Sequence, residues 1–190
     1  MRDIAQHLLD ILENSAKAGA SQVTVRFETA GSWLTIDISD NGPGFPAGVL
    51  AAPGDPWQTT RTTRAVGLGL SLLRAAAEQT GGQLRCANRD SGGAHLAARF
   101  NFAHIDAKPI GDLAETFLLA LLAWPSLDYN VSLGVNSAVV MVFDSVAVKA
   151  ELDGIAPGHP DIRRVLESIL KGAFSSLHTW SAQALFAGGG

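Results

Sequence analysis

Three polar side chains near the start of the chain have the types and the spacing to handle a metal ion and a phosphate. Residues 4–18 place apolar and polar side chains on opposite sides of a predicted helix. Residues four positions apart share a helix face, so Asp10 and Asn14 point into the same space. A carboxylate and an amide oxygen suit Mg²⁺ or the orientation of a water molecule, and Lys17 could meet a phosphate. The alternative is a helix that packs on a sheet with its polar side in water.

A second carboxylate ends a predicted strand. Residues 23–27 and 34–38 alternate apolar and polar side chains, which predicts a β-hairpin. The second strand runs directly into Asp40, and Gly42 and Gly44 follow it. Two spaced glycines let the backbone come close to a flat ligand. An ordinary Asp-Asn-Gly turn is the alternative, because such turns are common.

A long irregular stretch separates this hairpin from the next helix. Residues 46–66 fit neither a helical nor a strand period, and stretches of this kind are usually lids or binding loops. Its hydroxyl and guanidinium groups would suit a polyphosphate, although a solvated or protein-contacting loop is the alternative. Gly67, Leu68 and Gly69 then open a helix, whose free N–H groups form an anion site. The candidate ligands in the loop are Thr59, Thr60, Arg61, Thr62, Thr63 and Arg64.

The elements that must position these groups indicate an α+β fold. Residues 1–103 form a pattern of helix, two strands, loop, helix and two strands, which predicts a mixed sheet with helices on one face. A linker at 104–110 leads to a predicted smaller α/β extension at 111–180, whose long last helix starts at Pro160. We expect residues 181–190 to be a disordered tail. No catalytic or metal-binding constellation is evident in the extension.

Composition narrows the classes of partner. The 190 residues carry a net charge of −4, and no basic block is present, which argues against nucleic acid as the main partner. No apolar run reaches the about 20 residues that a membrane-spanning helix needs. The first ten residues include charged side chains where a signal peptide would be apolar. Because Cys86 is the single cysteine, no internal disulfide can form, and a cytoplasmic protein is the economical interpretation.

Taken together, four motifs resemble the GHKL superfamily of ATP-binding domains, which includes gyrase, heat-shock chaperone, histidine kinase and mismatch-repair ATPases. Each motif is weak alone, but their order and spacing are specific. The resemblance covers residues 1–103 and implies a two-layer α/β sandwich with a Bergerat-type mixed sheet that binds ATP with Mg²⁺. The motifs are LLDILENSAKAGA at 8–20, DNGPG at 40–44, TTRTTRAVGLGL at 59–70, and TGG with two closing strands at 80–102.

The resemblance implies a role for each candidate residue. Asn14 would ligate the Mg²⁺ that bridges the nucleotide phosphates, and Asp40 would accept a hydrogen bond from the adenine amino group. Gly42 and Gly44 would make room for the base. The ATP-hydrolysing branches place a Glu at the position of Asp10, where it orients or deprotonates water, so the shorter Asp10 is the catalytic candidate. The glycines at 67 and 69 would flank the phosphates and act as the hinge of a lid, and Lys17 matches a basic position near phosphate.

Several departures from the family pattern bear on function. A histidine kinase carries a dimerisation domain with a phospho-acceptor His before the opening helix, and we expect none here, because three residues precede that helix. His7 is predicted to be structural. The family often has a Thr where Ala94 follows Gly93, so that adenine contact is missing or is made by water.

Two hypotheses about function stay open. One is a regulatory enzyme, either a protein kinase that acts in trans on a separate protein partner or a slow ATPase. The other is a nucleotide-gated binding module, in which ATP orders the lid and turnover is incidental.

Overall fold

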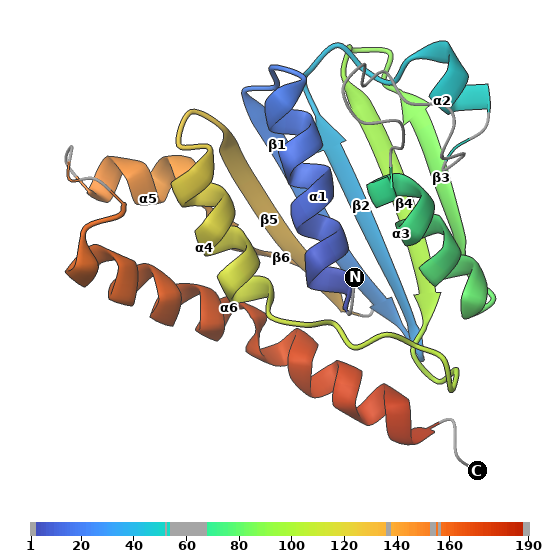
Figure 1. Ribbon diagram of the computed structural model, residues 1–190. Coiled ribbons are helices and arrows are strands. Elements are labelled where there is room, and N and C mark those ends of the chain that lie inside the picture. The colour runs from blue at the N-terminus through green and yellow to red at the C-terminus, as the bar shows by residue number, and fades with distance from the viewer. Residues whose placement is uncertain are drawn as a thin grey trace.

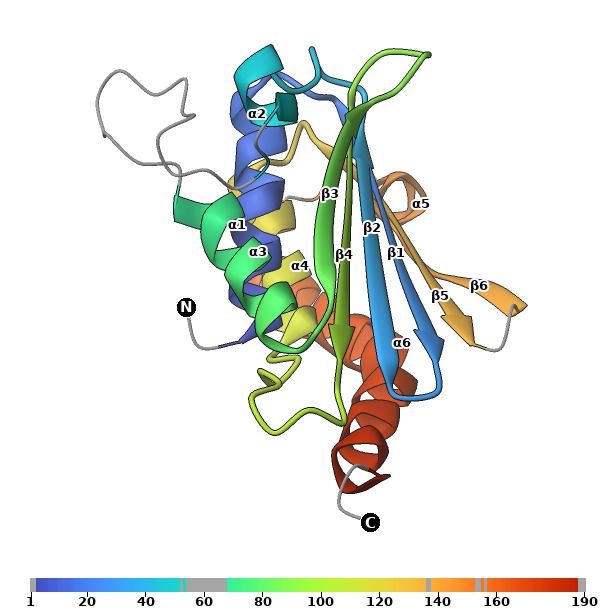
Figure 2. The same ribbon diagram turned by 90° about the vertical axis from the view of Figure 1, so that its right-hand side faces the viewer.

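The computed structural model describes residues 3–51, 53, 68–135, 138–152, 155 and 157–187. A six-stranded mixed sheet has the order β3-β4-β2-β1-β5-β6. Figures 1 and 2 show α1, α3 and α4 on one face of this sheet, which makes a two-layer α+β arrangement and confirms the predicted class. The elements are α1 Ile4–Lys17, β1 Gln22–Ala30, β2 Trp33–Asp40, α2 Ala47–Ala51, α3 Leu68–Gln79, β3 Gln83–Asn88, β4 Ala94–Asn101, α4 Leu113–Ala123, β5 Asp128–Val135, β6 Ala138–Asp144, α5 Ser145–Glu151 and α6 Pro160–Ala187.

Helix α1 is amphipathic, as its sequence predicts. The carboxylate of Asp3 caps its first turn by accepting the backbone N–H of Gln6 at 2.9 Å. Its apolar side, which includes Leu8 and Leu12, is buried against the sheet. The helix ends at Lys17, one residue before the predicted boundary. Its polar side therefore faces away from the core, where it can form part of a site.

The predicted hairpins are confirmed. Strands β1 and β2 pair antiparallel, with Val25 opposite Ile38, and both side chains are buried in the core. Strand β4 pairs antiparallel with β2 on one side and with β3 on the other. The end of β2 thus lies beside the start of β4, which brings Asp40 close to Ala94 although they are 54 positions apart in the sequence.

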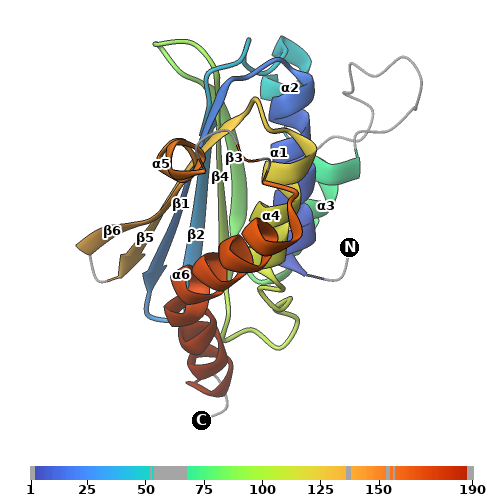
Figure 3. The same cartoon turned by 90° about the vertical axis from the view of Figure 1, so that its left-hand side faces the viewer.

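The C-terminal half continues the same sheet. Strand β5 pairs parallel with β1, and Val131 of β5 lies opposite Val25. Figure 3 shows α4 and α6 next to each other, with β5 and β6 at the edge of the sheet. The predicted small extension beside the ATP-binding half is therefore built into a single six-stranded sheet. Among the residues with assigned structure, no helix is long and apolar enough to cross a membrane.

The predicted disordered tail is wrong as far as Ala187. Helix α6 continues through residues 181–187, and Ala184 is buried. The indole of Trp180 donates to the backbone oxygen of Gly31 at 3.1 Å and packs against Phe102. These contacts hold the last helix against the turn of the β1–β2 hairpin.

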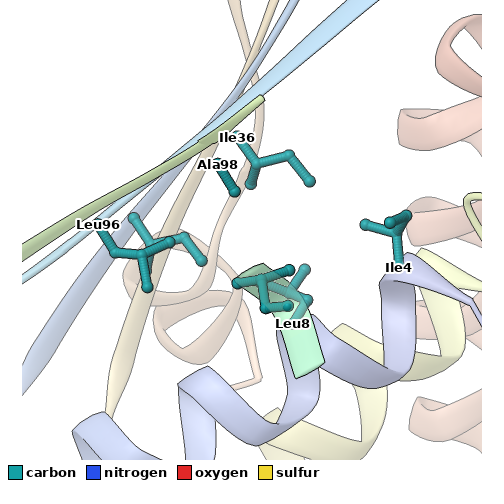
Figure 4. A pocket seen from close by; sticks show the side chains of 7 residues that line it. Ile4, Leu8, Ile36, Leu96 and Ala98 are labelled. Atoms are coloured by element: carbon teal, nitrogen blue, oxygen red, sulfur yellow. The ribbon is translucent and has the colours of Figure 1, made fainter. Parts of the chain in front are cut away.

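A small void lies in the core between α1, α3 and the sheet (Figure 4). Its lining is entirely apolar, and apolar cavities of this kind stay dry. It therefore belongs to the packing of α1 on the sheet and offers no polar group to a nucleotide. Its lining residues are Ile4, Leu8, Ile36, Ile38, Leu73, Leu96 and Ala98.

Candidate nucleotide site

Asp40, the last residue of β2, is the best-fixed polar side chain of the candidate site. Only 9% of it is exposed. Its Oδ1 accepts the backbone N–H groups of Gly42 and Ala94, each at 3.0 Å. Its Oδ2 accepts the hydroxyl of Ser15 at 2.8 Å. A buried carboxylate with three donors keeps one orientation, which is what a selective hydrogen-bond acceptor needs.

The turn that follows Asp40 is anchored at two points. The side-chain oxygen of Asn41 accepts the backbone N–H groups of Ser21 and Gln22, so Asn41 ties the turn to the start of β1. Further on, Asn88 of β3 binds the backbone N–H and C=O of Phe45. The predicted site residues Gly42 and Gly44 thus lie in a segment held by β1 on one side and β3 on the other.

Close contact between β2 and β4 shapes the floor of this region. Gly93 has a φ of +92°, and a Cβ on it would lie 1.9 Å from the backbone oxygen of Asp40. A residue with a side chain cannot be accommodated there without moving one of the two strands. Gly93 therefore lets the chain enter β4 with the N–H of Ala94 directed to the Asp40 carboxylate.

The polar side of α1 reaches a second element, the start of α3. A Cβ built on Gly69 would lie 2.8 Å from Oδ2 of Asp10, so the Asp10 carboxylate lies directly against the first turn of α3. Asn14 follows Asp10 by one turn of α1, and Ser15, the next residue, is bonded to Asp40. The C-terminal half of α1 therefore links the start of α3 to the end of β2.

These groups gather at one end of the molecule. In Figure 1 the C-terminal end of α1, the end of β2, the β3–β4 turn and α2 all lie at the top. Gly42 and Ser15, the neighbour of Asn14, contact Asp40 there, and Asp10 lies one turn before Asn14, against Gly69 at the start of α3. This arrangement can hold a ligand with an amino group at one side and negative charge at the other.

Lys17 is turned to a different partner. Its ammonium pairs with the Glu13 carboxylate one turn earlier, and its side chain is 55% exposed. This pair lies on the outer side of α1, so the structure does not join Lys17 to the Asp40 cluster. Its predicted contact with phosphate stays a prediction.

Part of the predicted site lies outside the described residues. This applies to Gly67 and to the run that comprises Thr59, Thr60, Arg61, Thr62, Thr63 and Arg64. Leu68 is described as the first residue of α3. The loop's predicted roles as a lid and a polyphosphate ligand stay predictions.

Ser15 is the site residue that sequence reasoning missed. It is only 4% exposed and lies where the buried and polar sides of α1 meet. Serine at such a position usually indicates no more than a small residue at the helix–sheet boundary. The available signal was its place directly after Asn14, which puts its hydroxyl on the part of α1 that lies beside the end of β2.

His7 is structural in the sense that it is completely buried. Neither ring nitrogen has a hydrogen-bond partner among the residues that the structure describes. Burial, with the charge of Lys108 as a second cause, lowers the pKa of His7 from 6.5 to about 4. The imidazole is therefore neutral at physiological pH and lies in the packed part of α1, away from the polar cluster.

The comparison with protein families matches residues 2–104 to the family described as "Histidine kinase-, DNA gyrase B-, and HSP90-like ATPase". An NtrY-like sensor histidine kinase of Rickettsia bellii is 31% identical over 109 residues, which are 55% of this chain and 18% of that protein. Sensor protein KdpD of Escherichia coli is 35% identical over 92 residues, which are 46% of this chain and 10% of KdpD. The chain thus spans less than a fifth of the length of these curated relatives.

A solved structure extends the likeness beyond the matched family segment. The MutL ATPase domain of Aquifex aeolicus, complexed with ADP, superposes with a TM-score of 0.50. The match covers 76% of this chain and 63% of that one, at 13% sequence identity. This shows a common fold, and the larger coverage fits the continuity of β5 with the sheet.

Proposed function

This chain belongs to the histidine kinase-, DNA gyrase B- and HSP90-like ATPase family, and we propose that it binds Mg·ATP at the end of the sheet where α1, β2 and α3 meet. The observation that carries the proposal is the buried Asp40 carboxylate, held by two backbone N–H groups and a hydroxyl. Desolvation of a carboxylate is costly unless the group is hydrogen-bonded. An acceptor fixed in this way suits a ligand that brings an amino group.

Asp40 would select adenine over guanine. Adenine carries an amino group at position 6 of the purine, and guanine carries a carbonyl there. The carboxylate would accept a hydrogen bond from the first and would face the second acceptor to acceptor. A site that leaves buried polar groups unpaired rejects the wrong ligand strongly.

The phosphates would lie between α1 and the start of α3. The first turn of a helix presents unpaired N–H groups to an anion. Asp10 places a carboxylate against this turn, so a phosphate is best bound there together with a divalent cation. Mg²⁺ in nucleotide sites takes one or two protein oxygens together with the phosphates, and Asn14 would supply its amide oxygen. In the part of the chain with assigned structure, no three His, Cys, Asp or Glu side chains form a metal site.

Asp10 is the residue on which enzymatic function depends. In a slow ATPase, or in a protein kinase that acts on a separate partner, it would orient the attacking water or hydroxyl and accept its proton. In a nucleotide-gated binding module the same carboxylate would only link α1 to α3. The closeness of Asp10 to Gly69 is compatible with this binding module too. A ligand that moved the start of α3 would also displace α1, because the two helices touch there.

Ligand-induced stabilisation tests the binding site. For the wild-type protein, ATP with Mg²⁺ at a hundredfold excess over Kd should raise the free energy of unfolding by about 2.7 kcal/mol and raise the melting temperature accordingly. Asp40→Asn should lose most of this rise. Asp37→Asn, on the same strand but beside His95 on the open face of the sheet, is the matched control and should keep it. An unchanged rise in Asp40→Asn would contradict the assigned site.

Phosphate release separates the two functions. If the protein is an ATPase, Asp10→Ala should keep its affinity for ATP and lose about 10²-fold or more of the hydrolysis rate. If wild-type protein and variant both lack turnover while ATP still raises the melting temperature, the binding-module hypothesis is favoured. A protein kinase would be recognised by transfer of labelled phosphate to a separate protein.

A further inference from the structure

Ser15 holds the Asp40 carboxylate, which is the proposed acceptor for the base. The Ser15 side chain is buried, with 4% of the residue exposed, and its hydroxyl donates to Oδ2 of Asp40 at 2.8 Å. The two residues lie on different elements, α1 and β2, and are 25 positions apart in the sequence. Resting on the proposed function, we propose that Ser15 is a positioning residue that sets the selectivity of this site for 6-aminopurines.

The count of hydrogen bonds on Asp40 leads to this role. A carboxylate has about four lone-pair positions, two on each oxygen. Both positions on Oδ1 are taken by the N–H groups of Gly42 and Ala94. Ser15 takes one position on Oδ2. Among the residues that the structure describes, no other group donates to this side chain, so one position on Oδ2 is left for a ligand.

The hydroxyl of Ser15 also fixes the polarity of the pair. A hydroxyl has a single proton, and Ser15 gives it to Asp40. Whatever lies against the two side chains therefore meets acceptors only. An amino group satisfies such a site, whereas a carbonyl oxygen leaves buried acceptors facing each other, which costs far more than a missing contact.

Among the described side chains of α1, Ser15 is the one that donates to the Asp40 carboxylate. Strand β4 contributes only the backbone N–H of Ala94, because the alanine side chain has no donor. Without Ser15, Oδ2 would lose the donor that the described residues supply to it, while Oδ1 kept both of its donors. The carboxylate would then be fixed at one oxygen only, and it could turn or recruit water at the oxygen that the base needs.

Two nucleotides that differ in one group test the proposal. ATP and purine riboside triphosphate are alike except that the second lacks the 6-amino group. Calorimetric titration with Mg²⁺ should show that Ser15→Ala lowers the affinity for ATP about tenfold, as expected for one hydrogen bond to a charged group. The affinity for purine riboside triphosphate should change less than twofold. The preference for ATP should therefore shrink about tenfold.

Three further variants make the result specific. Ser15→Thr keeps the hydroxyl and should restore the preference for ATP. Ser15→Cys fills the space left by the hydroxyl with a somewhat larger thiol, which is a much weaker donor, and it should behave like Ser15→Ala even where the alanine variant folds poorly. Ser39→Ala is the control and should match the wild-type protein, because the Ser39 side chain lies on the face of the sheet opposite to that of Asp40.

Equal losses of affinity for both nucleotides in Ser15→Ala and Ser15→Cys would overturn the proposal, since a purely structural role weakens both ligands alike. Unchanged affinity for both would overturn it as well. If the wild-type protein bound neither nucleotide, the proposed function itself would fail and this inference with it. Selective loss of ATP binding supports both.

Discussion

At the scale of single residues, buried polar groups divide into two kinds. Asp40 is buried with donors to both oxygens, whereas His7 is buried with neither nitrogen bonded to a described residue. The first arrangement creates a ready acceptor for a ligand. The second keeps the side chain uncharged, because a buried imidazolium without partners is far more unfavourable than a buried neutral imidazole.

His7 predicts how stability depends on pH. Its pKa in the folded protein is about 4, below the ordinary 6.5, so between these values the unfolded chain binds the proton more readily. The free energy of unfolding should therefore be highest above pH 6.5 and should fall by up to about 3 kcal/mol as the pH drops towards 4. Urea unfolding of the wild-type protein and of His7→Leu at several pH values measures this contribution.

The difference between the two curves is the quantity to compare, because it removes the contributions of the groups that both proteins share. His7→Leu should show a flatter curve between pH 4 and 6.5. His159→Leu, an exposed histidine next to Asp161, should retain the slope of the wild-type protein. Identical slopes for the wild-type protein and His7→Leu would show that the histidine does not contribute.

Residue types and spacing predicted Asp10, Asn14 and Asp40 as candidates, because helix and strand periods fix which side chains share a face. The Ser15–Asp40 hydrogen bond could not be predicted in the same way. It depends on the depth at which α1 packs on β2, and this depth is set by the apolar side chains between them rather than by the motif itself. For Lys17 the contact is local: its ammonium pairs with the carboxylate of Glu13, one turn earlier on the same helix.

At the scale of elements, the junction between β2 and β4 decides the shape of the site. Gly92 and Gly93 are neighbours with similar φ values of +86° and +92°. A Cβ on Gly92 would meet nothing within 4 Å, whereas a Cβ on Gly93 would collide with the backbone oxygen of Asp40. Substitutions at the two glycines therefore distinguish two costs. At Gly92 only the backbone angle is unfavourable, whereas at Gly93 a steric clash is added.

Gly93→Ala should therefore be more destabilising than Gly92→Ala. The change at Gly92 should cost about 1 kcal/mol, because an L-residue is placed at positive φ. The change at Gly93 should cost more and should also weaken ATP binding, since β4 must move away from Asp40. Melting temperatures with and without ATP measure both effects. Equal effects of the two substitutions would argue against close contact between the strands.

Local elements were predictable, and long-range pairing was not. The hairpins of β1 with β2 and of β3 with β4 follow from strand patterns joined by short turns. The parallel pairing of β5 with β1 joins residues about a hundred positions apart, and no local pattern specifies it. The length of α6 was underestimated because its last turns depend on tertiary contacts such as that of Trp180 with Gly31.

At the scale of the whole molecule, the two halves of the sequence share one core. Phe174 of α6 is fully buried, stacks on Phe117 of α4 at 5.5 Å and meets Phe27 of β1 edge-on at 6.0 Å. The aromatic cluster thus connects the last helix to β1, which lies inside the six-stranded sheet and belongs to the first half of the sequence. Residues on both sides of the linker at 104–110 should unfold together.

Phe174→Ala tests this continuity. Removal of a buried phenyl ring should cost on the order of 3–5 kcal/mol and lower a single cooperative melting transition. Val165→Ala, on the same helix at a side chain that is 55% exposed, should have little effect. Calorimetry would contradict the shared core if Phe174→Ala shifted one of two separate transitions and left the other in place.

The central claim is that a single nucleotide lies between Asn14 on α1 and Asp40 on β2. Nuclear magnetic resonance with a non-hydrolysable ATP analogue and Mg²⁺ tests it most directly. The side-chain amide of Asn14 and the backbone amides of Gly42 and Ala94, both bonded to Asp40, should shift together and give the same dissociation constant. The claim would be contradicted if the analogue bound while the Asn14 side chain, or both backbone amides beside Asp40, kept their signals unchanged.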